Sequence, residues 1–81
     1  MKIKTDFNYQ EGVWAGEKMV KIVSKTVYKT LEEAIRIKQE LITHFESDFG
    51  YTRDMPIFDR NYSYNAGILD ALLEAQTKQT N

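Results

Sequence analysis

The sequence has no cysteine and only one proline among its 81 residues. Small secreted domains are usually held together by disulfide bonds, so a chain without cysteine is typical of a reducing compartment. No apolar run approaches the roughly 20 residues that a membrane-spanning helix needs, and no apolar stretch follows the N-terminal lysines as it would in a signal peptide. We therefore expect a cytoplasmic protein that does not associate with membranes.

The motifs of common catalytic and cofactor sites are missing as well. The sequence has no glycine-rich phosphate-binding loop and no zinc-ligand spacing. Its one histidine, His44, falls beside Leu41 and Phe45 on the flank of a predicted helix, and no cysteine or serine nucleophile motif accompanies it. We interpret His44 as a residue at the edge of the core and expect a protein that is not an enzyme and binds no cofactor.

One segment partly matches a calcium-binding loop. Residues 59–70 place oxygen ligands at positions 1, 3, 5 and 12 of twelve, as an EF-hand loop does. However, Tyr64 occupies the position at which that loop turns on glycine, and Asp70 stands where a longer bidentate glutamate is needed. A helix N-cap at Asp59, Asn61 or Ser63 explains the same residues, so we predict no metal site.

Charge of one sign is not in excess, because the formal net charge is −1. Its distribution is uneven: residues 1–29 carry six lysines against three acids, and residues 30–81 carry five bases against nine acids. A net charge near zero argues against nucleic-acid binding by bulk electrostatics. The asymmetry indicates instead that the two halves present different surfaces to partners.

The chain does have enough apolar material for a core. Hydrophobic residues make up 42% of the sequence, and ten aromatic residues contribute large side chains. This composition and length predict a single folded domain over residues 1–81.

The first third of the chain has a pattern typical of strands. Residues 2–9 alternate between apolar and polar, residues 10–12 suggest a turn, and Gly16 suggests a bulge or bend. The β-branched residues that follow predict strands over about 18–23 and 26–29. A helical interpretation of residues 17–29 remains open, as an extension of the next helix.

Two helices are predicted in the remainder. Thr30 and Glu33 form a capping box, an apolar stripe runs over residues 31–49, and Gly50 is suited to end that helix. A second helix is predicted over about 62–78. The expected fold class is thus α+β: a small two-layer domain in which two or three antiparallel strands pack against two helices.

One lysine interrupts the apolar stripe of the first predicted helix. Lys38 lies between Ile35 and Leu41 on the buried side. An unpaired buried ammonium is costly, so Lys38 must either extend to water at the edge of the core or pair with an acid.

Two surfaces are candidates for binding. On the predicted strands, a basic face combines Lys21, Lys25 and Lys29, which suits either a solvated sheet surface or contact with phosphate. On the second predicted helix, a smaller apolar line lies beside the main one and suits a protein partner or a homodimer contact. This line consists of Tyr64, Ile68, Ala71 and Ala75.

The segment 64–72 is similar to the closing helix of many short phage and mobile-element proteins. With the missing catalytic motifs, this leads us to expect a small non-enzymatic regulator or inhibitor that acts by contact with a protein partner. Two alternatives stay open: nucleic-acid binding through the basic N-terminal sheet, and a structural role as a subunit of a larger assembly.

Overall fold

The computed structural model describes residues 7–22, 30–53 and 59–79, and these form three α-helices. They are α1 (Phe7–Ile22), α2 (Leu31–Phe49) and α3 (Arg60–Gln79). About 90% of the described residues are helical, and none of them is in a strand. The prediction of a two-layer α+β domain is therefore wrong, and the fold is an all-α globule of three helices.

The predicted strands fall on α1 or outside the described residues. Residues 7–9 form the start of α1 and residues 18–22 form its end, whereas 2–6, 23 and 26–29 lie outside the described residues. The alternating pattern failed because Phe7 and Tyr9, assigned to one face of a strand, lie about 200° apart on a helix. Accordingly, Tyr9 is buried and Phe7 is exposed. Residues 17–22 are helical, as the open alternative allowed, but they belong to α1.

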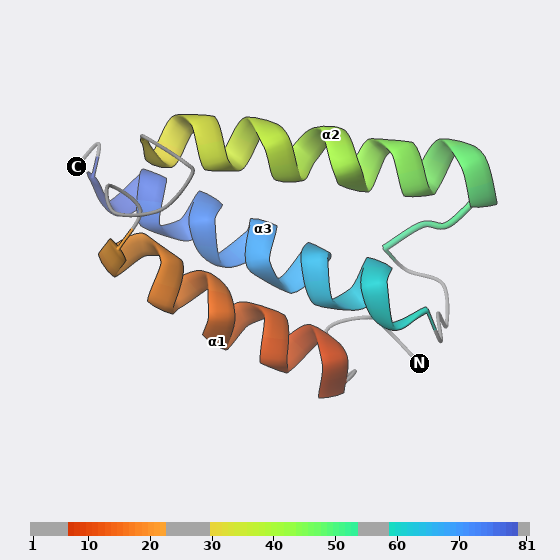
Figure 1. Cartoon of the computed structure of the whole chain (residues 1–81), viewed down its shortest axis with the longest axis horizontal. Helices are drawn as coiled ribbons and strands as arrows, with labels where there is room; N and C mark the ends of the chain where they lie inside the picture. The colour runs from red at the N-terminus through yellow and green to blue at the C-terminus, as the bar shows by residue number, and fades with distance from the viewer. Residues whose placement is uncertain (1–6, 23–29, 54–58, 80–81) are drawn as a thin grey trace.

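Helix α3 lies between the other two helices, with α1 and α2 on its two sides (Figure 1). Its apolar residues are therefore needed on more than one flank, which explains why both apolar lines of the sequence occur on it. The core is built mainly from α2 and α3, with one aromatic residue from α1. It comprises Tyr9, Leu31, Ala34, Ile35, Ile42, Tyr62, Ala66, Ile68, Leu69 and Leu72.

Helices α1 and α3 approach each other closely because glycines lie at their crossing. A Cβ atom built on Gly12 would be 2.0 Å from the Tyr64 carbonyl oxygen, and one built on Gly67 would be 2.2 Å from the Tyr9 carbonyl oxygen. A Cβ on Gly16 would come within 2.8 Å of the Ala71 Cβ. The predicted bulge at Gly16 is thus a point inside a helix where the missing side chain lets a neighbouring backbone approach.

Helix α2 has the bounds predicted from the sequence. The Thr30 hydroxyl accepts a hydrogen bond from the Glu33 backbone N–H at 3.1 Å, which caps the first turn as expected. At the other end Gly50 adopts φ 70°, in the left-handed region, and its N–H donates to the Glu46 carbonyl oxygen at 2.9 Å.

Helix α3 begins two residues before the predicted start. The Asp59 Oδ1 atom accepts hydrogen bonds from the backbone N–H groups of Asn61 and Tyr62, at 2.9 and 3.2 Å. Asp59 is therefore the N-cap that the sequence suggested as the explanation of the calcium-like pattern.

Lys38 lies at the contact between α2 and α3. Its Nζ atom donates a hydrogen bond to Asn65 Oδ1 at 3.0 Å, and partial burial lowers its pKa. Neither sequence-based expectation named this partner. The amide oxygen satisfies one ammonium donor at the edge of the core, and the group remains only half-buried.

Candidate functional site

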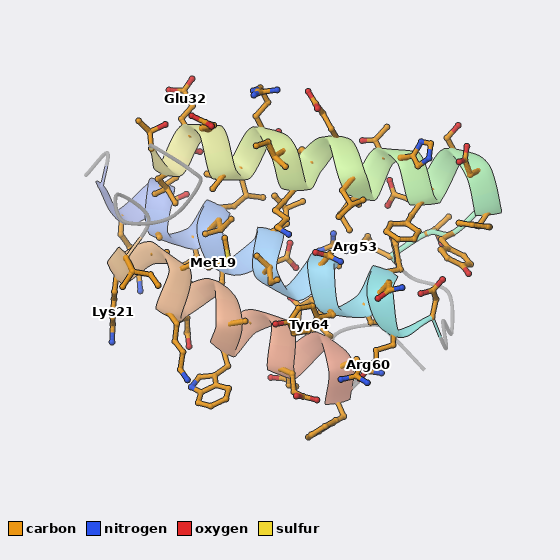
Figure 2. The ribbon with its side chains drawn as sticks, in the orientation of Figure 1. Met19, Lys21, Glu32, Arg53, Arg60 and Tyr64 are labelled. Atoms are coloured by element: carbon orange, nitrogen blue, oxygen red, sulfur yellow. The ribbon has the colours of Figure 1, made fainter. Side chains whose placement is uncertain are left out.

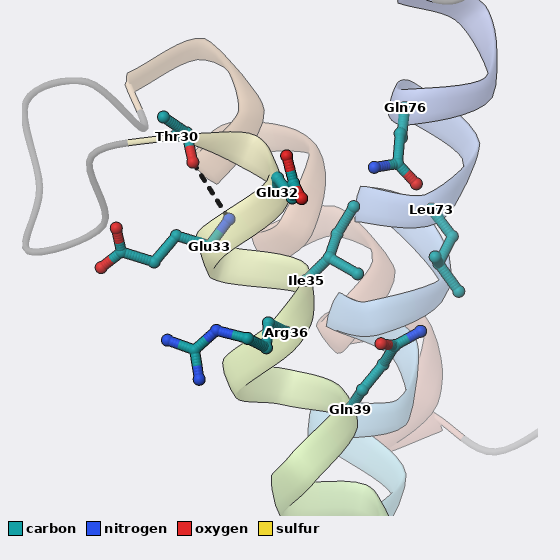
Figure 3. A pocket seen from close by; sticks show the side chains of 8 residues that line it. All are labelled: Thr30, Glu32, Glu33, Ile35, Arg36, Gln39, Leu73 and Gln76. Atoms are coloured by element: carbon teal, nitrogen blue, oxygen red, sulfur yellow. Dashed lines mark hydrogen bonds between the residues drawn. The ribbon is translucent and has the colours of Figure 1, made fainter.

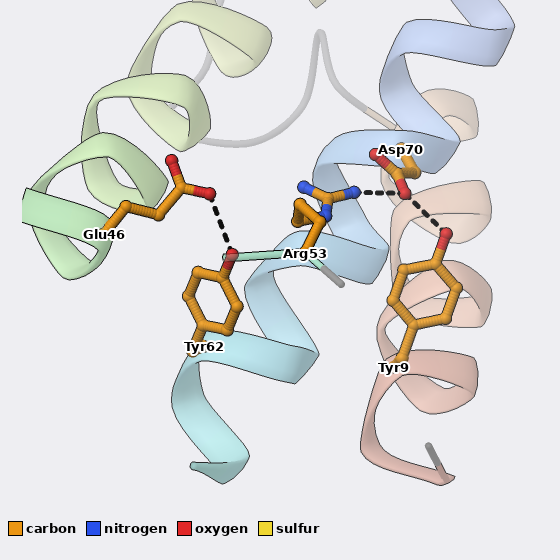
Figure 4. A network of polar contacts seen from close by, with 5 residues as sticks. All are labelled: Tyr9, Glu46, Arg53, Tyr62 and Asp70. Atoms are coloured by element: carbon orange, nitrogen blue, oxygen red, sulfur yellow. Dashed lines mark hydrogen bonds and ion pairs between the residues drawn. The ribbon is translucent and has the colours of Figure 1, made fainter. Parts of the chain in front are cut away.

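A half-buried polar network joins α1, α3 and the segment that follows α2. Tyr9 on α1 donates a hydrogen bond to Asp70 Oδ2 on α3 at 2.5 Å, and Arg53, just beyond α2, pairs with the same carboxylate oxygen. Figure 4 shows Arg53 lying between Tyr62 and Tyr9. Burial is the main cause that raises the pKa of Tyr9 to about 12, and the hydrogen bond to Asp70 contributes as well. The Tyr9 hydroxyl is therefore a hydrogen-bond donor at neutral pH.

Two further tyrosines, Tyr62 and Tyr51, form side-chain hydrogen bonds between neighbouring segments of the fold. The Tyr62 hydroxyl donates to Glu46 on α2 at 2.8 Å, and burial followed by this hydrogen bond raises the pKa of Tyr62. Tyr51 donates to Asp59 at 3.0 Å, and this bond raises its pKa.

No buried side-chain nitrogen or oxygen among the described residues lacks a hydrogen-bond partner. Burial alone would lower the pKa of Arg53, but the hydrogen bond and charge of Asp70 outweigh it and the pKa is raised. The groups of the network thus bond to one another and hold α1, α3 and the segment after α2 together.

The apolar line predicted as a partner surface is largely inside the fold. Ile68 is 4% exposed and Ala71 is 6% exposed, and both lie where Gly16 of α1 meets α3. Tyr64 is 37% exposed, and Ala75 is partly buried. Helix α1 of the same molecule therefore covers the middle of the apolar line, and only the two ends of the line, Tyr64 and Ala75, reach the surface.

The predicted basic face is only partly described. Lys21 is exposed and extends away from the end of α1 (Figure 2). Lys25 and Lys29 lie outside the described residues. The sheet on which the three lysines were placed does not occur among the described residues, since Lys21 is helical.

His44 is on the solvent side of α2. Its side chain is 72% exposed, and Nε2 lies 2.9 Å from the Asp48 carboxylate one turn later. It is thus further from the core than the predicted edge position. No group of three or more metal-binding side chains occurs in residues 7–22, 30–53 and 59–79.

A hollow between α2 and α3 is open and polar. It has a volume of about 540 Å³ and lies between the start of α2 and the end of α3, where Thr30, Glu32, Arg36, Gln39 and Gln76 surround Ile35 and Leu73 (Figure 3). Ligand sites are usually concave and mostly apolar, with a few convergent polar groups. The mixed charges at the rim and the small apolar floor do not form such a site.

The most unusual surface is on α1, opposite its glycines. Phe7 is 73% exposed, Trp14 is 60% exposed and Ile22 is 47% exposed. At about 100° per residue they share an arc of about 80° with two charged residues. We call this set the outer face of α1: Phe7, Glu11, Trp14, Lys18 and Ile22.

The aromatic centre of the outer face is ordered by a neighbouring lysine. The Lys18 ammonium lies 3.6 Å from the centroid of the Trp14 ring, one turn away on the helix. Such a cation–π contact favours one orientation of the indole ring. Tyr64 of α3 adjoins this face, since it lines a small hollow with Glu11 and Arg60.

The sequence contained a signal for this surface that the strand interpretation obscured. Gly12 and Gly16 are four residues apart, as are Gly67 and Ala71 on α3. Small residues at this spacing are typical of helices whose backbones approach closely. Assigning them to the buried side of a helix would have placed Phe7 and Trp14 on the outside.

No family model, curated protein or solved structure matches this chain. Among the described residues, none of the three helices combines the length and apolar composition needed to cross a membrane.

Proposed function

We propose that this chain is a small non-enzymatic binding protein, a regulator or inhibitor, that recognises another protein through the outer face of α1. The observation that carries the proposal is the exposure of Phe7 and Trp14 on one side of a helix. Aromatic residues are enriched among the side chains that dominate binding energy at protein interfaces. The absence of cysteine supports action in the cytoplasm.

Charge supports a protein partner over a nucleic acid. Helix α1 carries Glu11 and Glu17 alongside Lys18 and Lys21, so its charges balance. A surface for phosphates would need an excess of positive charge. Nucleic-acid binding remains the alternative, and it would require lysines beyond α1.

Affinity capture from cells that express the protein tests the proposal. We expect a protein retained by the unmodified chain to be lost with Phe7→Ser/Trp14→Ser, because the exposed anchors are removed. The matched control is Phe49→Ser, since Phe49 is also 60% exposed but lies at the end of α2. Circular dichroism must show that all variants remain helical.

Two results would contradict the proposal. One is a retained protein whose capture is equally strong with and without Phe7 and Trp14. The other is recovery of nucleic acid alone, with binding that falls steeply as salt increases.

A further inference from the structure

The order of residues along the outer face of α1 is antisymmetric. An apolar residue stands at each end, Phe7 and Ile22, and Trp14 is at the centre. Between them an acid, Glu11, lies on the N-terminal half and a base, Lys18, on the C-terminal half.

This order matches itself when one copy is reversed. In an antiparallel pair of α1 helices whose two-fold axis passes near Trp14, residue numbers that sum to about 29 face each other. Phe7 then meets Ile22 of a second copy, and Glu11 meets Lys18. The two Trp14 rings lie beside the axis, where they can stack on each other.

We propose that the occupant of the outer face of α1 is a second copy of this chain, bound antiparallel to form a symmetric dimer. The inference rests on the proposed function and identifies its partner. A contact with two-fold symmetry must be self-complementary, because the same patch is used by both subunits. The apolar ends, the central aromatic residue and the two reciprocal ion pairs meet that condition.

Two features favour this arrangement over a parallel pair, and a third leaves the outer face free for a second copy in either orientation. A parallel pair would place Glu11 against Glu11 and Lys18 against Lys18, which is repulsive. The antiparallel pair also opposes the two helix dipoles favourably. Finally, the covering of Gly12 and Gly16 by α3 leaves the outer face on the free side of α1.

The dimer is expected to be weak. Helix α1 has 16 residues, which makes it about 24 Å long at 1.5 Å per residue. One helix pair of this length buries less than the roughly 1,600 Å² of a standard stable interface. Association should therefore depend on protein concentration and belong to the transient class.

Sedimentation equilibrium of the purified chain from micromolar to millimolar concentration is the test. We expect a monomer–dimer equilibrium, and we expect Glu11→Lys and Lys18→Glu each to weaken it about ten-fold, because like charges then meet twice. An equal mixture of the two variants should restore dimerisation, since positions 11 and 18 again carry opposite charges at both contacts across the mixed pair.

Matched controls separate this result from nonspecific charge effects. Glu40→Lys reverses an exposed charge on α2 and should leave the equilibrium unchanged. Glu11 adjoins Arg60 across a small hollow, so Glu11→Gln is included as a milder variant, and circular dichroism confirms that each variant is folded.

The other possible results each contradict one part of the proposal. A monomer at millimolar concentration, or a dimer indifferent to both charge reversals, overturns the self-association of this face. Weakening without restoration in the mixture overturns the antiparallel arrangement. In either case a foreign protein whose capture requires Phe7 and Trp14 would leave the proposed function standing, so the two failures are distinguishable.

Discussion

Replacing Gly12 by alanine tests the closest helix contact in the fold. The added Cβ atom would lie 2.0 Å from the Tyr64 carbonyl oxygen, whereas ordinary contact begins at 3.4 Å. The difference, about 1.4 Å, must be met by separating α1 from α3, because the obstructing atom belongs to a helix backbone that cannot rotate away.

The expected cost follows from that displacement. Gaps of 0.5–1 Å already forfeit a quarter to a half of a dispersion contact, and overpacking a core costs about 1–3 kcal/mol, occasionally more. We take about 4 kcal/mol for a backbone clash and subtract about 1 kcal/mol for the better helix propensity of alanine. The net loss is about 3 kcal/mol, which corresponds to a fall in Tm of about 12–24 °C for a domain of this size.

Urea unfolding followed by circular dichroism measures this loss, with graded comparisons built into the chain. Gly67→Ala should cost about as much as Gly12→Ala, whereas Gly16→Ala should cost less because its Cβ would be 2.8 Å from its nearest neighbours. The double variant at Gly12 and Gly67 should lose less than the sum, since both substitutions force the same separation. Gly50→Ala, which has nothing within 4 Å, should show only the strain of its positive φ, about 1 kcal/mol. If Gly12→Ala were as stable as the unmodified chain, the close crossing of α1 and α3 would be refuted.

Two further predictions concern α1 and its contacts with α3. The pKa of Tyr9 is raised from 10.0 to about 12 in the folded chain. Its contribution to stability is therefore complete below pH 10 and disappears as the pH rises through about 12. Urea unfolding measured across this pH range should show that Tyr9→Phe loses less stability at alkaline pH than the unmodified chain. Ile68→Glu should unfold the domain, as seen by circular dichroism, because Ile68 is 4% exposed and a buried charge is costly. Tyr64→Glu, at a site 37% exposed, should leave the domain folded. An Ile68→Glu variant that stays folded would show that Ile68 is not part of the core.

The parts of the fold that could be predicted are those with local signals. Helix α2 has a capping box at Thr30, a single apolar stripe and a terminal Gly50, and each signal comes from residues close in the sequence. Helix α3 was located to within two residues at its start. Its second apolar line was recognised, but the sequence could not show whether the neighbour that covers it is the same chain or another.

Helix α1 was not predicted because two residues of its buried side, Gly12 and Gly16, are glycines, which interrupt the apolar stripe that Tyr9, Val13 and Val20 form there. Gly12 and Gly16 face α3 and contribute little hydrophobicity, whereas Phe7 and Trp14 face outward. Apolar residues therefore occur on both sides of this helix, so that no single stripe identifies its buried face, and β-branched residues near its end favour a strand. The contact is identified by the pairing of Gly12 and Gly16 on α1 with Gly67 and Ala71 on α3, which are distant in the sequence.

This arrangement bears on function because it separates the two tasks of α1. Gly12 and Gly16 let the backbones of α1 and α3 approach closely, and Tyr9 and Val13 add larger side chains to the same side of α1. Phe7 and Trp14 lie on the other side of α1, outside that contact, and their exposure is unfavourable unless another chain covers them. Substitutions at Phe7 and Trp14 should therefore alter association with little effect on unfolding, whereas substitutions at Gly12 and Gly67 should do the opposite. Independence of these two measurements is the expected signature of a helix that binds its own chain with one face and a partner with the other.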